Sequence, residues 1–294
     1  MLATKYSVLS VKYYQPMKNS SIVSIQWLKD HLSDPDLILL DATIPKAGGK
    51  NVGELQEIQI PGTRFFDLKG AFMDKSSPLP NTIPSAEAFT NASQALGINR
   101  DSKLVVYDKW GIYSSPRACW LLRQMGHANV SVLDGGLPAW IAAGFATETV
   151  SKGEYSQGDF VANFDASAVR TADDMLANIK ATQAKVLDAR SYGRFKATAP
   201  EPRADLIGGH IPGSQSLAFT EVLKDGKFLP DEELVSVFAK LDLGDSPLIF
   251  SCGSGITACI ILLAAERVLE NETALYDGSW SEWGLPDKGL PIEQ

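Results

Sequence analysis

Residues 247–265 read PLIFSCGSGITACIILLAA, and they carry the clearest information about the fold of this chain. Residues 247–250 form an apolar run that predicts a buried strand, and residues 258–265 form a longer apolar run that predicts a buried helix. A glycine-containing turn that begins with Cys252 joins them. Apolar strands alternating with helices are typical of a mostly parallel sheet covered by helices on both faces, so we expect an α/β fold.

Cys252 stands where ligands bind in such folds, beyond the carboxyl end of a strand. The N–H groups of the turn can point at its sulfur, and the positive end of the helix dipole favours a negative charge there. Both effects favour the nucleophilic thiolate. Gly253 and Gly255 allow the backbone to curl around a bound atom. We therefore interpret Cys252 as a nucleophile, against the alternative of a small buried residue, which we prefer for Cys119 and Cys259.

The chain repeats itself once. Four pairs of short segments recur in the same order, roughly 145 to 150 residues apart: 39–43 and 186–190, 59–62 and 210–213, 104–108 and 248–252, and 132–136 and 275–279. Four matches in register indicate a duplicated domain of ordinary size. We predict an N-terminal extension over residues 1–20, a first domain over 21–148, a polar linker over 149–167 and a second domain over 168–294, each domain with a mostly parallel sheet flanked by helices.

The two halves differ in the chemistry that they offer. Asp108 occupies the position in the first half that corresponds to Cys252, so the first half has no nucleophile there. We expect the second half to be catalytic and the first to act as a scaffold and as one wall of a cleft. Tyr113 lies in the corresponding first-half loop and is a candidate for that wall.

The composition excludes several classes of protein. A net charge of −8 argues against a general nucleic-acid surface, and no apolar stretch is long enough for a membrane helix. Three cysteines and three histidines without a CxxC pair predict neither a disulfide framework nor a zinc site. The N-terminal residues lack the features of a signal peptide, so we expect a cytoplasmic protein.

Three arginines follow the strand predicted to end at Asp188. Arg190, Arg194 and Arg203 all lie on the carboxyl side of the sheet, and the planar guanidinium matches a carboxylate. Anion binding and simple surface charge are equally supported by this spacing. His210 is a candidate general base, but a histidine in a turn beside a strand is more often structural, and we prefer that interpretation.

From about Ile22 to the C-terminus, the duplicated organisation and the paired Ile-Pro-Gly turns resemble tandem rhodanese-domain sulfurtransferases. The loop from Cys252 to Thr257 is similar to that of members that use 3-mercaptopyruvate. Members that use thiosulfate carry Arg and Lys where this chain has Gly253 and Ser254. The resemblance implies catalytic roles for Cys252 and Ser254, the serine assisting proton transfer. It implies substrate contacts from the following residues: Tyr113, Arg194, Arg203, Gly253, Gly255, Ile256 and Thr257.

The resemblance implies an enzyme that moves the sulfur of 3-mercaptopyruvate through a persulfide on Cys252 and releases pyruvate. The sulfur would pass to a thiol acceptor such as thioredoxin, or to cyanide, without a metal or an organic cofactor. Alternatives are a thiosulfate sulfurtransferase and a non-catalytic sulfur carrier or binding module. A related class of phosphatases needs an arginine six residues after the cysteine, where this chain has Ala258. Many relatives have a histidine before the first Ile-Pro-Gly, assigned to a triad with the loop serine, where this chain has Gln59.

Overall fold

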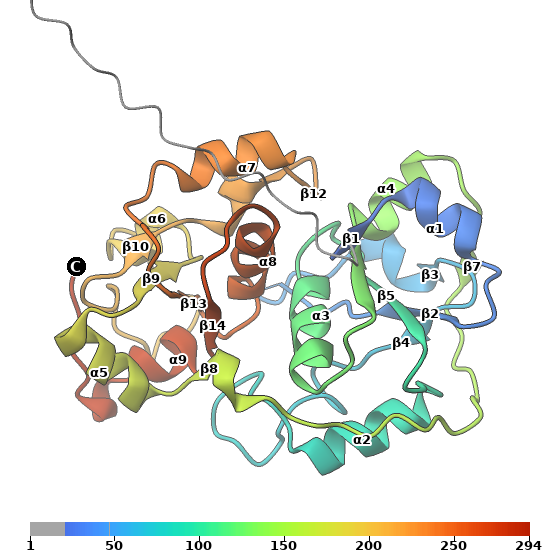
Figure 1. Ribbon diagram of the computed structural model, residues 1–294, viewed down its shortest axis with the longest axis horizontal. Coiled ribbons are helices and arrows are strands. Elements are labelled where there is room, and N and C mark those ends of the chain that lie inside the picture. The colour runs from blue at the N-terminus through green and yellow to red at the C-terminus, as the bar shows by residue number, and fades with distance from the viewer. Residues whose placement is uncertain (1–20, 47) are drawn as a thin grey trace, which may run out of the picture.

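Two five-stranded parallel sheets form the framework of the protein (Figure 1). The computed structural model describes residues 21–46 and 48–294, so the predicted extension over residues 1–20 lies outside the described part. The first sheet has the order β1-β6-β5-β2-β4, with β1 at Ile22–Val23, β6 at Val130–Leu133, β5 at Lys103–Tyr107, β2 at Leu37–Asp41 and β4 at Arg64–Phe65. Every neighbouring pair in it is parallel.

The second sheet repeats this topology. Its order is β8-β14-β13-β9-β10, with β8 at Val169–Arg170, β14 at Thr273–Tyr276, β13 at Leu248–Ser251, β9 at Lys185–Asp188 and β10 at Gln215–Ser216. All of its pairs are parallel as well. Each strand therefore has a counterpart in the other half, which confirms the α/β fold predicted from the duplicated segments.

The central strands are apolar throughout because both faces of each sheet are covered. In β2, Ile38 and Leu40 point into one hydrophobic cluster, and Leu39 points into another on the opposite face. The outer face of the first sheet packs on α1 (Ile25–His31) and α4 (Gly136–Ala142), and that of the second sheet packs on α5 (Ala172–Ala181) and α9 (Ser279–Trp283).

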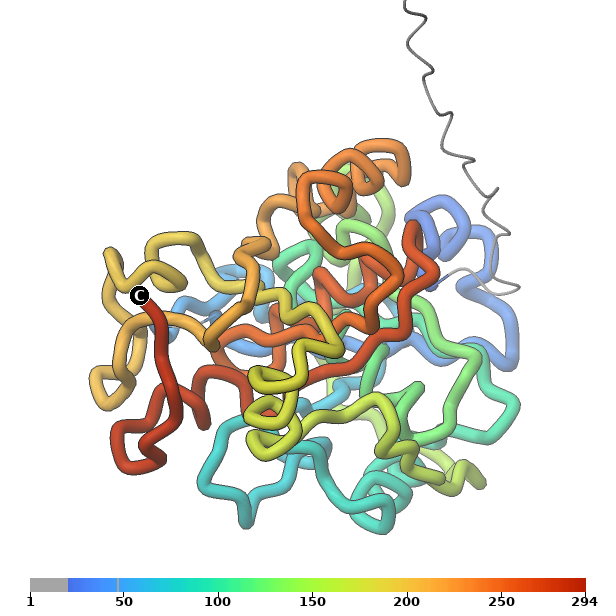
Figure 2. Tube along the Cα trace, turned by 60° about the vertical axis from the view of Figure 1, so that its left-hand side comes forward, coloured from blue at the N-terminus to red at the C-terminus, as the bar shows by residue number. Residues whose placement is uncertain are grey.

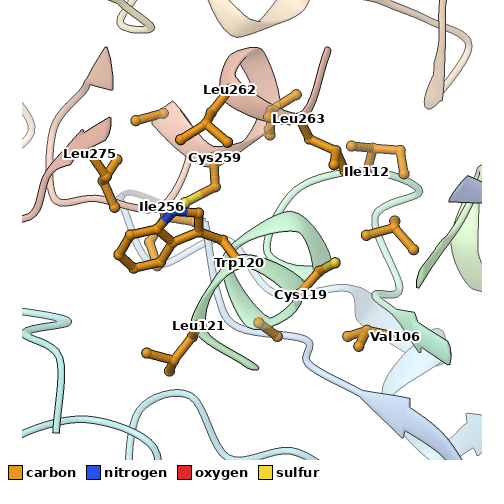
Figure 3. Close-up of a cluster of buried hydrophobic side chains, with 14 of the residues drawn as sticks. Val106, Ile112, Cys119, Trp120, Leu121, Ile256, Cys259, Leu262, Leu263 and Leu275 are labelled. Carbon is orange, nitrogen blue, oxygen red and sulfur yellow. The ribbon is translucent and has the colours of Figure 1, made fainter. Parts of the chain in front are cut away.

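The inner faces of the two sheets share one hydrophobic core. The helices of this core are α2 (Ala86–Ala95), α3 (Ser115–Gln124), α7 (Asp231–Phe238) and α8 (Ala258–Val268). Trp120 of α3 faces Cys259 and Leu262 of α8 (Figure 3). Because α8 lies between its own sheet and α3, its apolar residues from 258 to 265 are all buried. Cys119 and Cys259 are buried in this core, as predicted.

The remaining elements are short. A one-turn helix, α6, spans Tyr192–Phe195, and two antiparallel pairs join β3 (Ile58–Gln59) to β7 (Glu148–Thr149) and β11 (Leu223–Lys224) to β12 (Lys227–Phe228). The chain between β7 and β8 runs along α2 (Figure 1). The N–H of Gly158 donates to the carbonyl of Gln94 at 2.9 Å, and Phe160 is buried, so this connection is packed on the first half. Within the described residues, no helix has the length and apolar character needed to cross a membrane.

Candidate active site

Cys252 follows the last residue of β13, and its turn is held from one side by α9. The N–H of Cys252 donates to Ser279 Oγ at 3.2 Å, and its carbonyl accepts from the N–H of Trp280 at 2.9 Å. The carbonyl of Gly253 accepts from the N–H of Ser281 at 2.8 Å and from its Oγ at 2.7 Å. In a trans peptide the N–H points away from the carbonyl, so the N–H groups of residues 253 and 254 face away from α9.

The matching turn of the first half surrounds a carboxylate. Asp108 is fully buried, and its Oδ2 accepts the N–H groups of Tyr113, Ser114 and Ser115 at 2.8 to 2.9 Å. Its Oδ1 accepts the N–H of Trp110 at 2.9 Å. Burial raises the pKa of Asp108, and these hydrogen bonds oppose that rise. In the first half this turn therefore binds the carboxylate of Asp108, and Cys252 occupies the corresponding position in the second half.

A cavity of about 530 Å³ lies over Cys252 between the two halves. Eight of the nine predicted site residues line it: Tyr113, Arg194, Arg203, Cys252, Gly253, Ser254, Ile256 and Thr257. Tyr113 comes from the first half and lies edge-on to Phe219 of the second, with ring centroids 6.2 Å apart. The structure thus places the predicted residues together, with the first half forming one wall.

Gly255 is the exception, because it does not line the cavity. It is buried with a φ of +77°, and its carbonyl accepts from Arg117 Nη1 at 3.3 Å. A Cβ there would lie 3.1 Å from the carbonyl oxygen of Asp277. Gly255 therefore shapes the turn through its backbone.

Glu201 holds Arg194 against the turn. Glu201 Oε2 accepts from Arg194 Nη2 at 2.6 Å, and its Oε1 accepts from Arg190 Nη1 at 2.8 Å. A Cβ on Gly253 would lie 3.1 Å from Arg194 Nη2, so the absence of a side chain at residue 253 gives the guanidinium its place. Because the Arg194 side chain stays 22% exposed, it can still meet a ligand in the cavity.

The other two arginines have different surroundings. Arg190 is completely buried, and its guanidinium is bound by Asp188, Glu201 and the carbonyl of Gly209. Although Arg190 borders the cavity, these partners take four of its five N–H donors, which favours a structural role for it. Arg203 lies at the rim, where it pairs with Asp205 in solvent, and such pairs are weak.

Sequence reasoning missed four first-half residues with polar side chains that line the cavity. These are Lys46, Lys50, Lys69 and Asn81. Lys46 Nζ lies 4.3 Å from the ring centroid of Trp110 and 5.2 Å from that of Tyr113. Burial lowers the pKa of Lys46 and of Lys69. No local motif marks these residues, because only the packing of the two halves brings their loops to Cys252.

Two other residues, Gln59 and His210, do not line the cavity of Cys252. Gln59 donates to Glu148 Oε1 at 2.7 Å and lines a different cavity from Ser254, and Asn81 of the first half contacts Ser254 instead. His210 stacks on Phe195 and bonds its carbonyl at 3.0 Å, as expected for a structural histidine. Within residues 21–46 and 48–294, no group of three or more His, Cys, Asp or Glu is arranged to hold a metal.

Comparison with known proteins gives the family. A model of the rhodanese-like domain matches residues 24–143 and 171–285. The 3-mercaptopyruvate sulfurtransferase of Escherichia coli (strain K12) is 38% identical over 281 residues, which cover 94% of this chain and 99% of that protein. The mitochondrial thiosulfate/3-mercaptopyruvate sulfurtransferase 1 of Arabidopsis thaliana is 38% identical over 313 residues, covering 98% of this chain and 80% of that protein.

A solved structure agrees with these matches. The crystal structure of SseA from Escherichia coli, described as a 3-mercaptopyruvate sulfotransferase with the rhodanese fold, has a TM-score of 0.80 and 38% identity to this chain. It covers 90% of this chain and 100% of its own. Since the two domain matches fall on the two halves of the duplicated fold, the chain belongs to the rhodanese family and carries the rhodanese-like domain twice.

Proposed function

We propose that this chain is a 3-mercaptopyruvate sulfurtransferase that carries sulfur as a persulfide on Cys252. The observation that carries the proposal is the position of Cys252, in the turn that matches the carboxylate-binding turn of Asp108 and beside a cavity that Arg194 also lines. The names of the full-length relatives support the same substrate. The residues beside the cysteine, Gly253 and Ser254, are uncharged, which suits a small keto acid better than an inorganic dianion.

The first step transfers sulfur to the enzyme. The Cys252 thiolate attacks the sulfur of 3-mercaptopyruvate, an S–S bond forms, and the bond from sulfur to C3 breaks. Its electron pair moves into an enolate, which takes a proton at C3 and leaves as pyruvate. Because the thiol of the substrate loses one proton as the persulfide anion forms and C3 gains one, the step needs no external acid or base overall. The turn amides stabilise the anionic sulfur before and after the attack.

The cavity provides positive charge for an anionic donor. Lys46, Lys50 and Lys69 come from the first half, and Arg194 and Arg203 come from the second. Glu201 is the acidic residue of the lining, and it is already shared by Arg190 and Arg194. In a chain of net charge −8, this local excess of cations draws a carboxylate toward Cys252.

In the second step, a thiolate acceptor attacks the outer sulfur of the persulfide and restores the Cys252 thiolate. The acceptor is a small thiol or a protein thiol such as thioredoxin.

The choice of donor tests this proposal directly. We expect kcat/KM for 3-mercaptopyruvate, measured by pyruvate release, to exceed kcat/KM for thiosulfate, measured by sulfite release, by at least about tenfold. Mass spectrometry after incubation with 3-mercaptopyruvate alone should show one added sulfur on the Cys252 peptide. A preference for thiosulfate would instead identify a thiosulfate sulfurtransferase, and the absence of turnover with either donor would indicate a sulfur carrier.

Arg194 and Arg203 should contribute unequally to turnover. Arg194→Ala is expected to lower kcat/KM for 3-mercaptopyruvate at least about tenfold, because it removes a guanidinium oriented by Glu201. Arg203→Ala should lower it only about two- to fourfold, because Arg203 is half-exposed and paired with Asp205. Arg100→Ala, which removes an exposed arginine outside the cavity, is the control. Equal effects of Arg194→Ala and Arg100→Ala would contradict the assignment.

A further inference from the structure

A series of hydrogen bonds crosses from the first half to the turn of Cys252. Asn81 belongs to the segment between β4 and α2, which extends from the first half toward the second (Figures 1 and 2). Its Nδ2 donates to Ser254 Oγ at 2.9 Å and to the Ser254 carbonyl at 3.0 Å. Its Oδ1 accepts from Lys69 Nζ at 2.7 Å. Lys69, Asn81 and Ser254 are thus joined in series beside the cavity that all three line.

The direction of each bond in the series is fixed by the groups that form it. An ammonium group can only donate, so the amide oxygen of Asn81 must face Lys69, and its NH₂ group must face Ser254. The backbone of Asn81 is anchored as well, because its carbonyl accepts from Arg117 Nη2 at 2.7 Å. Its φ of 61° lies in the left-handed region, which Asn adopts more readily than most residues.

This direction determines what Ser254 can do. Its Oγ accepts a hydrogen bond from Asn81, and its own hydroxyl proton is available for donation. Ser254 and Cys252 line the same cavity two residues apart, so a reactant bound at the sulfur of Cys252 would lie in a cavity that Ser254 also lines. A serine held in this way has a hydroxyl proton to donate to a ligand in the cavity.

Lys69 adds a charge at the far end of the series. In the described part of the chain, no carboxylate lies within 4.0 Å of Lys69 Nζ, so its charge is not neutralised by an ion pair. Donors linked in series polarise one another, and a cation at the start strengthens each later donor. The positive charge of Lys69 therefore makes the Ser254 hydroxyl a stronger donor.

We propose that Lys69 and Asn81 are positioning residues that hold Ser254 as a hydrogen-bond donor to the keto acid while its enolate forms. The inference rests on the proposed function, because the enolate arises only when the bond between sulfur and C3 of 3-mercaptopyruvate breaks. A donor aimed at developing negative charge stabilises the transition state more than the ground state. Through this series, the half without a nucleophile takes part in the chemistry of the other half.

The test is a double-mutant cycle on pyruvate release. Asn81→Asp keeps the size of the side chain, tolerates the backbone conformation and can still bind Lys69. A carboxylate only accepts hydrogen bonds, however, so the Ser254 hydroxyl donates to it and no longer donates into the cavity. We expect kcat to fall at least about tenfold with KM changed less than about threefold, and Ser254→Ala to give a similar fall. The double variant should lose no more than Ser254→Ala alone, because both changes remove one interaction.

Lys69→Met provides a second variant that leaves the amide of Asn81 in place. Its fall in kcat, expected to be about threefold or more, should also vanish in the Ser254→Ala background. Lys75→Met is the matched control, since it removes a charge from the same segment outside this cavity, and it should leave kcat unchanged. Losses that multiply in the double variants, an unchanged kcat in Asn81→Asp, or an equal fall in Lys75→Met would each overturn the proposal.

The unmodified chain separates this inference from the proposed function. If it releases no pyruvate and forms no persulfide on Cys252 with 3-mercaptopyruvate, the proposed function fails and the inference fails with it. If it does both, and the losses in the cycles multiply, the inference alone is wrong. Release of pyruvate together with non-multiplying losses supports both.

Discussion

Cys252→Ser is expected to lower pyruvate release from 3-mercaptopyruvate at least about a thousandfold, because it removes the atom that accepts the sulfur. The change is nearly isosteric at a position that is 1% exposed, and the hydrogen bonds from Cys252 to Ser279 and Trp280 involve only its backbone. The fold should therefore persist. Pyruvate release and the mass of the protein after incubation with substrate measure the two consequences, loss of turnover and loss of the added sulfur.

Cys119→Ala is the matched control for this variant. Cys119 is a buried cysteine of α3 whose sulfur faces the carbonyl of Val130 at 3.9 Å, and it does not line the cavity. Burial raises the pKa of the Cys119 thiol, which favours its neutral, unreactive form. Cys119→Ala should keep both pyruvate release and the added sulfur. If Cys252→Ser kept the added sulfur, another residue would be the carrier and the mechanism would be wrong.

The fold was predictable because its causes are local and repeated. An apolar strand followed by a glycine turn and an apolar helix defines one unit, and the recurrence of four segments in register defines two copies of the domain. Successive residues of β2, such as Leu39 and Leu40, are buried on opposite faces of the sheet, which explains the unbroken apolar run. What the repeats could not give is how the halves pack, since the facing surfaces of α3 and α8 are apolar like the rest of the core.

The site residues that lie on one loop were predictable from the sequence. The site residues that come together only where the two halves meet were not. Cys252 and its turn are contiguous, so their spacing is visible in the sequence. Lys69 and Asn81 are far from Ser254 in sequence, and only the docking of their segment brings them together. The sequence left the role of Arg190 open between anion binding and surface charge, and only the structure shows its buried carboxylate partners.

Arg190→Met should be the most destabilising single change considered for this chain. The side chain of Arg190 is fully buried, its Nη2 donates to Asp188 Oδ2 at 2.6 Å, and its guanidinium lies 4.0 Å from the ring centroid of Trp280. Methionine fills much of the same space but leaves the carboxylates of Asp188 and Glu201, 3% and 2% exposed, without their shared partner. Removing one member of a buried ion pair costs about 3–5 kcal/mol of stability.

The midpoint and slope of urea unfolding measure this loss, and Arg203→Met, which breaks the exposed pair with Asp205, should cost less than about 1 kcal/mol. A loss below about 1 kcal/mol for Arg190→Met would contradict the buried network.

The first half neutralises the corresponding carboxylate differently: Asp41 pairs with Lys109, the counterpart of Gly253, at 3.4 Å. Because Arg190 neutralises Asp188 in the catalytic half, residue 253 needs no side chain, and the space beside Cys252 stays open for Arg194 and for substrate.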